Sequence, residues 1–311
     1  IRVFADAPAV PSVSLSNTTI NFGNVAIATN SFQVLTITNS GNSDLVLGTL
    51  LDDNLFNLDI IYNIDLIDTA PAYGSSEKVL GDLDTKDFQI VTKTRHFSQD
   101  VIGRQEVDFL THDFNQSLEL LNRKKVYGVL VHNGDDLLKS GADQIYKRLV
   151  QFKEDGLISK IGVSIYTNEQ LKKVINNFDI DIVQLPFNIL DRRLIDSGMF
   201  KLLKKRGIEI HARSIFLQGL LLISEKDIPV KFNQWKDLWM LWNDWLNDNN
   251  MTALEATVRC AISMKEISKV LVGVHSKIHL QEIVKASSGS LPEIPKELFI
   301  NDVGLLNPSN W

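Results

Sequence analysis

The strongest constraint on the fold is a repeated alternation, from residue 59 onward, between short apolar runs and longer charged segments. The apolar runs have the length of buried strands, and the charged segments between them read as helices. Seven runs follow one another at a spacing of roughly 30 residues. They are IDLIDTA (64–70), FQIVTKT (88–94), VYGVLVHN (126–133), KIGVSIY (160–166), DIVQLPFN (181–188), IEIHARSIF (208–216) and KVLVGVHS (269–276).

The connections between these runs predict parallel strands. Helical segments such as 141–156 and 168–178 join consecutive runs, and Gly156 and Gly207 stand where helix C-caps are expected. Buried strands joined by helical crossovers form a parallel sheet that is covered on both faces. With seven repeats and no G-x-G-x-x-G fingerprint after the first strand, we predict an α/β fold of the (β/α)8 TIM-barrel type, not an open dinucleotide-binding sheet.

The start of the barrel is ambiguous, because an eighth strand is needed before residue 64. Residues 45–50 (LVLGTL) could supply it, with residues 52–63 as a shortened first helix. The same residues could instead continue a β-sandwich. Either the first β/α unit is shortened, or it is missing and an unrelated fragment precedes the barrel.

Residues 1–58 differ in character from the rest of the chain. They are rich in Ser, Thr, Asn and Val, and contain no Lys and only Arg2 as a basic residue. Period-two alternation, broken by Gly and Asn, predicts a small antiparallel sandwich-like segment here. We therefore divide the chain into a β-rich segment, 1–58, and a barrel, 59–311, that ends in a loop-rich tail, 291–311.

Composition excludes several classes of function. The formal net charge of −6 argues against nucleic-acid and anionic-membrane partners. The single cysteine, Cys260, can form no internal disulfide and excludes a cysteine-rich zinc site, and we expect no metal. No apolar run approaches the roughly 18 residues of a membrane span, and no signal peptide is visible. We expect a cytoplasmic protein.

Polar residues end three successive strands. Active sites of such barrels lie at the C-terminal ends of the strands. Asp68, Lys93 and His132 occupy these ends, and Tyr73 follows the first strand. Each residue alone has an ordinary structural explanation, such as a helix cap or a buried histidine. Their joint occurrence predicts a catalytic group.

These motifs resemble the aldo-keto reductase family. IDLIDTAPAYGSSEKVLG (64–81) resembles the family signature around its catalytic Asp and Tyr, IVTKT the strand bearing the Lys, and VYGVLVHN the strand bearing the His. IDIVQLPFNILDRR, ARSIFLQGLLL and VLVGVHS resemble the family's cofactor-binding strands. The resemblance covers residues 59–290 and implies an NAD(P)-dependent oxidoreductase.

The implied reaction is reduction of an aldehyde, ketone or sugar-like carbonyl. Tyr73 would donate the proton, although a tyrosine phenol has an ordinary pKa of about 10. Lys93 would favour the phenolate and so make Tyr73 a better acid. Asp68 would hold Lys93 in its charged form, and His132 would bind the carbonyl oxygen. The hydride would come from nicotinamide.

The resemblance also implies cofactor contacts. The implied set is Ser164 and Gln184 for the carboxamide, Ser214, Gln218 and Gly219 for the pyrophosphate, Gly273, Ser276 and Lys277 in the turn for the adenosine phosphate, and Glu282 for the adenine. Ile165 stands where many relatives carry Asn, and His275 where a basic residue is usual. We expect NADP as the cofactor, with NAD as the alternative.

Two further interpretations concern partners. Residues 11–48 resemble the first half of Ig-like domains of the abnormal-spindle and ciliary type. The alternative function is a barrel whose catalysis is impaired by its altered start and which serves as a binding or scaffold module, with the strand-rich N-terminus mediating contacts. Trp235, Trp239, Trp242 and Trp245 fall at helical spacing, which predicts either a helix packed on the barrel or a subunit interface. Apart from the small-molecule carbonyl, partners and the oligomeric state are left open.

Overall fold

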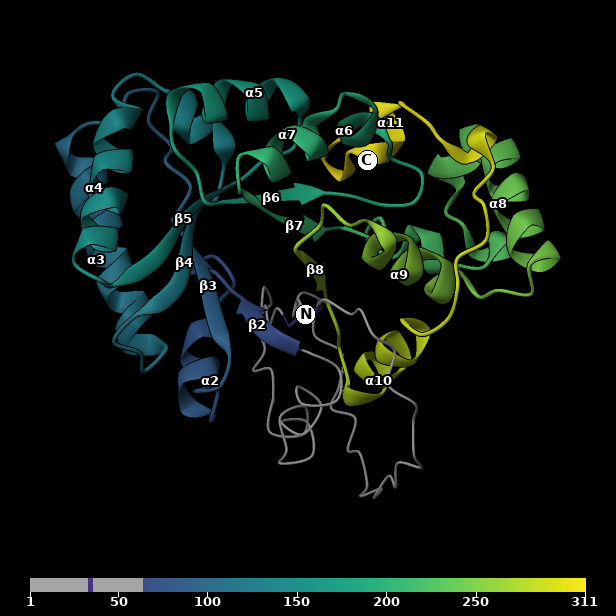
Figure 1. Ribbon diagram of the computed structural model, residues 1–311, viewed down its shortest axis with the longest axis horizontal. Helices are drawn as coiled ribbons and strands as arrows, with labels where there is room; N and C mark the ends of the chain where they lie inside the picture. The colour runs from purple at the N-terminus through teal and green to yellow at the C-terminus, as the bar shows by residue number, and fades with distance from the viewer. Residues whose placement is uncertain (1–32, 36–63) are drawn as a thin grey trace.

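The computed structural model describes residues 33–35 and 64–311. In this part of the chain, eight strands form a closed barrel in the order β1 to β8, and every neighbouring pair is parallel (Figure 1). The strands are β1 Gln33–Leu35, β2 Ile64–Asp68, β3 Gln89–Lys93, β4 Val126–Val131, β5 Ile158–Ser164, β6 Ile182–Pro186, β7 Glu209–Arg213 and β8 Lys269–Val272.

Helices follow the strands and cover the outside of the barrel. The α-helices are α2 Ser76–Asp82, α3 Arg104–Leu120, α4 Ala142–Glu154, α5 Asn168–Asn177, α6 Arg193–Asp196, α7 Met199–Lys205, α8 Lys236–Asp248, α9 Ala253–Ser263, α10 Lys277–Ala286 and α11 Val303–Leu306. Short 3-10 helices are η2 Gly134–Leu138, η3 Leu220–Leu222, η4 Glu225–Asp227, η5 Val230–Trp235, η6 Lys296–Leu298 and η7 Pro308–Asn310. None of the described helices is both long enough and apolar enough to cross a lipid bilayer.

The predicted barrel is confirmed. Six of the seven apolar runs contain one whole strand, and β5 begins two residues before the run 160–166; the segments between the runs contain the helices. Gly156 and Gly207 follow α4 and α7 with φ angles of 73° and 71°. A residue other than glycine is strained in this left-handed region, which explains why glycine ends both helices.

The barrel start differs from the sequence expectation. Gln33–Leu35 was predicted to lie in an antiparallel sandwich, but it pairs in parallel with both β2 and β8 and closes the barrel. The antiparallel prediction is wrong for these three residues. Residues 45–50, which the sequence offered either as the closing strand or as part of the sandwich, lie outside the described residues, as does the rest of 1–58 on either side of β1.

Inward-facing and outward-facing residues alternate along each strand, as the pleat requires. Leu66, Val91, Leu130, Ile182 and Leu271 form a small apolar cluster inside the barrel, separate from the larger core between strands and helices. Above and below this cluster, several inward positions carry polar or charged side chains, such as Lys93 and Gln184 at one end and Lys160 and Glu209 at the other. The two polar layers therefore belong to the two ends of the barrel.

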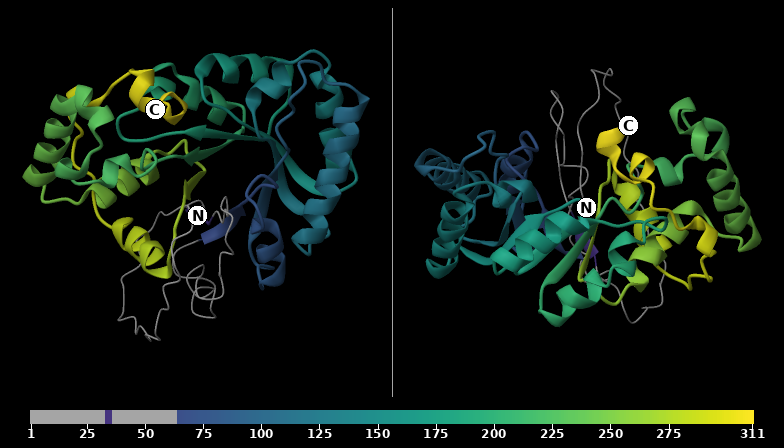
Figure 2. Two further views of the ribbon diagram at one scale, coloured as in Figure 1. Left: turned by 180° about the vertical axis from the view of Figure 1, so that it is seen from behind. Right: turned by 90° about the horizontal axis from the view of Figure 1, so that it is seen from above.

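The tryptophan helix packs against the C-terminal segment. Trp239, Trp242 and Trp245 of α8 are buried, and Trp245 Nε1 donates a hydrogen bond to the Glu293 carbonyl oxygen at 3.0 Å. The Trp311 ring lies 4.9 Å from the Phe232 ring. Figures 1 and 2 show α8 on the opposite side of the molecule from α3 and α4. Three of the four tryptophans therefore pack inside this molecule, and Trp235 is half-buried.

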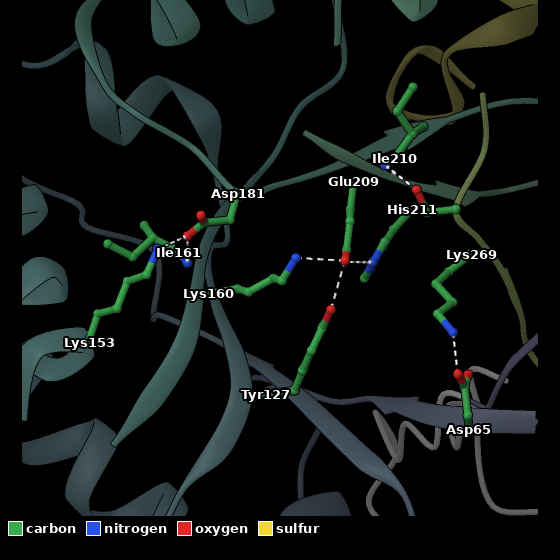
Figure 3. A network of polar contacts seen from close by, with 11 residues as sticks. Asp65, Tyr127, Lys153, Lys160, Ile161, Asp181, Glu209, Ile210, His211 and Lys269 are labelled. Atoms are coloured by element: carbon green, nitrogen blue, oxygen red, sulfur yellow. Dashed lines mark hydrogen bonds and ion pairs between the residues drawn. The ribbon is translucent and has the colours of Figure 1, made fainter. Parts of the chain in front are cut away.

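A charged network fills the N-terminal end of the barrel (Figure 3). Glu209 Oε1 accepts hydrogen bonds from Lys160 Nζ and Tyr127 Oη, both at 2.7 Å, and Glu209 Oε2 lies 3.3 Å from His211 Nε2. Lys269 pairs with Asp65 on the neighbouring side of the same end. This end is closed by paired charges.

The network sets the ionisation of Glu209. Burial alone would raise its pKa, but the hydrogen bonds from His211, Lys160 and Tyr127 together lower the pKa from 4.5 to about 2. Ionised Glu209 therefore stabilises the folded state. This contribution is complete above pH 5 or so and is lost as the pH falls through 4.5 toward 2.

We predict that the free energy of unfolding falls less steeply between pH 5 and pH 2 in Glu209→Gln than in the wild type. The difference should reach at most about 3 kcal/mol, because each pKa unit corresponds to about 1.4 kcal/mol. Urea unfolding at several pH values measures it. Glu154→Gln, on the exposed face of α4, controls for the loss of one carboxylate. Parallel curves for wild type and Glu209→Gln would contradict the prediction.

Candidate active site

The four predicted catalytic side chains lie together at the C-terminal end of the barrel. Asp68 ends β2, Lys93 ends β3, and His132 directly follows β4. Tyr73 lies in the loop between β2 and α2. Since adjacent parallel strands end at the same edge, these positions bring a carboxylate, an ammonium, an imidazole and a phenol to one place.

Lys93 and Asp68 form a fully buried ion pair. Lys93 Nζ donates to Asp68 Oδ2 at 2.6 Å and to the Thr69 carbonyl oxygen at 2.9 Å, and neither charged side chain is exposed. The second carboxylate oxygen, Asp68 Oδ1, accepts from Gln184 Nε2 at 2.8 Å. Buried charges are tolerated only when paired and hydrogen-bonded, and each partner here satisfies the other.

Tyr73 lies against both the ammonium and the imidazole. Its side chain is largely buried, with 8% of the residue exposed. Lys93 Nζ is 4.8 Å from the centre of the Tyr73 ring. The Tyr73 and His132 rings meet edge to face, with centroids 5.8 Å apart. The ammonium and the imidazole therefore both lie within contact range of the Tyr73 ring.

A second histidine, which the sequence reading missed, stacks on the first. The His96 ring lies 4.4 Å from the His132 ring, and His96 is exposed. The backbone N–H of His132 donates to Thr94 Oγ1 at 3.2 Å, which fixes the turn after β4. His132 is therefore held between Tyr73 and His96.

Glu77 anchors the loop that carries Tyr73. It accepts hydrogen bonds from Thr92 Oγ1 at 2.6 Å and from Ser117 Oγ at 3.0 Å, and so ties α2 to β3 and α3. Burial raises the pKa of this carboxyl, although the two hydroxyls oppose the rise. Because Thr92 precedes Lys93, Glu77 positions the strand that carries the ammonium.

A cavity of about 600 Å³ opens beside β7, β8, α9 and α10. Five of the predicted cofactor residues line it, namely Ser214, Gln218, Gly219, Gly273 and Glu282. The chain around β7 bends sharply here, since Ser214, Leu217, Gln218 and Gly219 all have positive φ angles. Non-glycine residues in this conformation are uncommon and cluster at ligand sites.

The other four predicted cofactor residues lie outside the cavity wall. Ser164 and Gln184 face the barrel interior in neighbouring strands, and the Gln184 amide is bonded to Asp68. The Ser276 hydroxyl caps α10 by accepting from the His279 N–H at 3.2 Å, and Lys277 is the first residue of α10. His275 lines the cavity and directly precedes Ser276 and Lys277, so these two residues lie next to the cavity wall.

The cavity has the chemistry that a nicotinamide dinucleotide requires. Its volume falls within the range of roughly 300–1,000 Å³ that is typical of ligand sites. Arg213, His275 and His279 offer hydrogen-bond donors for phosphate oxygens, and Glu282 offers an acceptor. Apolar side chains such as Phe216 and Leu254 complete the wall for the planar rings. The residues present fit the group.

Arg213 is a lining residue that the sequence reading missed. It ends β7 facing inward and is 7% exposed. Its alternation with Glu209 and His211 along the same strand was a signal that could have identified it as an interior cation.

Among the described residues, His, Cys, Asp and Glu side chains form no group of three or more that could hold a metal ion.

Comparison with known proteins agrees with this geometry. The sequence model of the aldo/keto reductase family matches residues 58–294. The fold is similar to the holo form of an aldo-keto reductase from Bacillus halodurans, with a TM-score of 0.67 and 18% identity over 85% of this chain and 89% of that chain. It is also similar to a glycerol dehydrogenase from Gluconobacter oxydans, with a TM-score of 0.62 and 18% identity over 85% of this chain and 88% of that one.

These structural similarities establish the fold, whereas the family match establishes the family. A sequence search among curated proteins finds no match. The N-terminal resemblance to Ig-like domains gains no support, because the family match begins at residue 58 and the structure describes only Gln33–Leu35 of that segment. The match over residues 58–294 spans well over half of the sequence and includes every strand from β2 to β8. The chain therefore belongs to the aldo/keto reductase family of NAD(P)-dependent oxidoreductases.

Proposed function

We propose that this protein reduces an aldehyde, ketone or sugar-like carbonyl with NADPH, and that Tyr73 supplies the proton. The observation that carries the proposal is the contact of Tyr73 with both the buried Lys93–Asp68 pair and His132. The proposal is supported by a cavity at the same end of the barrel, whose lining residues suit a nicotinamide dinucleotide. A bound nicotinamide supplies the hydride.

Tyr73 acts as the general acid. When the carbonyl carbon gains a hydride, negative charge develops on the carbonyl oxygen, and a nearby acid must neutralise it. The Lys93 ammonium stabilises the phenolate that remains after Tyr73 has released its proton. Asp68 pairs with Lys93 and fixes its position through a 2.6 Å bond.

His132 orients the substrate. Its ring meets Tyr73 edge to face, so a carbonyl oxygen that accepts from the Tyr73 hydroxyl lies within reach of the imidazole. Two donors on one oxygen restrict the carbonyl to a single orientation, and such restriction lowers the entropic part of the barrier. His96 extends the imidazole surface toward solvent, where the rest of the substrate enters.

We also propose which residues contact each part of the bound dinucleotide. Ser164 and Gln184, at the level of the ion pair, are proposed to bind the carboxamide. Ser214, Gln218 and Gly219 are proposed to follow the pyrophosphate. The turn Gly273 to Lys277, which includes Ser276, is proposed to take the adenosine phosphate, with Glu282 near the adenine. Lys277 and the His275 imidazole favour NADP over NAD, because a 2′-phosphate needs positive charge and donors.

Replacing the proposed proton donor tests the reaction. We predict that Tyr73→Phe lowers the rate of aldehyde-dependent NADPH oxidation by about 100-fold or more, because general acid catalysis contributes 10²–10⁴-fold. The absorbance of NADPH at saturating cofactor measures it. Tyr146→Phe is the control, since the Tyr146 hydroxyl bonds only to a backbone carbonyl on the outer surface, at 2.9 Å.

Cofactor binding should survive the same substitution. Fluorescence titration of Tyr73→Phe with NADPH should give a dissociation constant close to that of the wild type. Equal turnover rates in Tyr73→Phe and the wild type would remove Tyr73 from the mechanism. Tight NADPH binding by the wild type, without turnover of any carbonyl, would favour the scaffold function instead.

The preference for NADP has its own test. We predict that Lys277→Met weakens NADPH binding by about tenfold, or about 1.4 kcal/mol, and leaves NADH binding nearly unchanged. The reason is that only NADPH carries the 2′-phosphate. Lys285→Met, at the other end of α10, controls for the loss of one helix lysine. If NADPH and NADH lose affinity equally in Lys277→Met, Lys277 does not recognise the 2′-phosphate.

A further inference from the structure

The inner end of the cavity carries a permanent positive charge. Arg213 donates a hydrogen bond from Nη2 to the Ile165 carbonyl oxygen at 3.2 Å and from Nη1 to Ser214 Oγ at 3.4 Å. Its guanidinium carbon lies 4.3 Å from the centre of the Tyr166 ring. Guanidinium groups stay protonated in proteins, so this charge does not depend on pH.

Arg213 stands close to the catalytic group in the barrel. Its backbone pairs with Pro186 in β6, two residues after Gln184, and Gln184 is bonded to Asp68. Of the residues that line the cavity, Arg213 and Leu271 also face the barrel interior. They therefore mark the end of the cavity that is nearest to the Lys93–Asp68 pair.

The contacts hold the guanidinium rigidly. Tyr166 covers one face through a cation–π contact, and two hydrogen bonds fix the plane. Arg213 is only 7% exposed, so water screens its charge poorly. Any group that enters this end of the cavity meets a fixed and weakly screened cation.

We propose that Arg213 makes the site bind the reduced cofactor more tightly than the oxidised one. This inference rests on the proposed function, which brings the nicotinamide ring to the inner end of the cavity. The ring is neutral in NADPH and positively charged in NADP⁺, whereas the phosphates are the same in both. A fixed cation beside the ring therefore raises the free energy of the NADP⁺ complex alone.

The consequence is that the reduced cofactor occupies the site in preference to the oxidised one. In the balanced reaction, the hydride leaves nicotinamide C4 for the carbonyl carbon, and the carbonyl oxygen takes a proton from Tyr73. The ring becomes cationic in the same step. Charge repulsion from Arg213 then promotes dissociation of the oxidised cofactor, so that NADPH can replace it in the site.

Equilibrium binding tests the proposal without any turnover. Dissociation constants for NADPH and NADP⁺ are measured by calorimetry on the wild type, Arg213→Gln and Arg213→Lys at one pH and ionic strength. We expect the wild type to bind NADP⁺ about tenfold more weakly than NADPH, or about 1.4 kcal/mol. Arg213→Gln should bring the two constants close together, and Arg213→Lys should keep most of the difference.

The outcomes separate this proposal from the one on which it rests. If the wild type binds neither cofactor, the proposed function fails. If the wild type binds NADPH and NADP⁺ with equal affinity, the proposed role of Arg213 is overturned while the reductase proposal stands. The wild-type measurements alone give that result. If Arg213→Gln weakens both cofactors by the same factor, Arg213 binds their shared phosphates, which also overturns the proposal. Arg206→Gln, at the end of α7, should leave the ratio unchanged and serves as the control.

Discussion

The candidate site depends on one interaction, the fully buried pair of Lys93 and Asp68. Two charges in a barrel interior are costly unless each satisfies the other, and the 2.6 Å bond, with added bonds to Thr69 and Gln184, meets that condition. The pair makes contact with three other parts of the site. It connects β2 to β3, it links Asp68 across the barrel to β6, and it holds an ammonium under the Tyr73 ring. A structure that needed only stability would gain as much from apolar residues here, so the pair is better explained by chemistry than by packing.

The two ends of the barrel use charge for different purposes. At the N-terminal end, Glu209 and its partners neutralise one another and close the barrel, which contributes stability that acid removes. At the C-terminal end, a buried ion pair lies beneath Tyr73 and an arginine lines the cavity. Lys93 faces the phenol, and Arg213 faces the cavity, and we propose that the first cation assists proton transfer and the second acts on the charge of the cofactor ring. The apolar cluster around Leu130 and Ile182 separates the two ends.

Much of this arrangement was predictable from the sequence, because strong local patterns specify it. The seven apolar runs and the polar residues at their ends gave the barrel and the convergence of the catalytic group. The closing strand was not predictable in the same way, since Gln33–Leu35 has the period-two pattern of any short strand and its partners are decided by tertiary pairing. Arg213 and His96 were missed for another reason. A charged residue at an inward strand position is visible in sequence, but the neighbour that gives it a role, Tyr166 or His132, becomes adjacent only in the folded barrel.

The central claim is that the buried ion pair serves the acidity of Tyr73, and it can be tested with both charges removed together. The double variant Asp68→Asn/Lys93→Met keeps similar side-chain volumes and leaves no uncompensated charge in the barrel. Single-turnover hydride transfer from bound NADPH to an aldehyde, followed by stopped-flow absorbance, measures the chemical step. The account predicts a rate at least about 100-fold below that of the wild type, with an unchanged far-ultraviolet circular dichroism spectrum. A folded double variant that transfers hydride at the wild-type rate would contradict it.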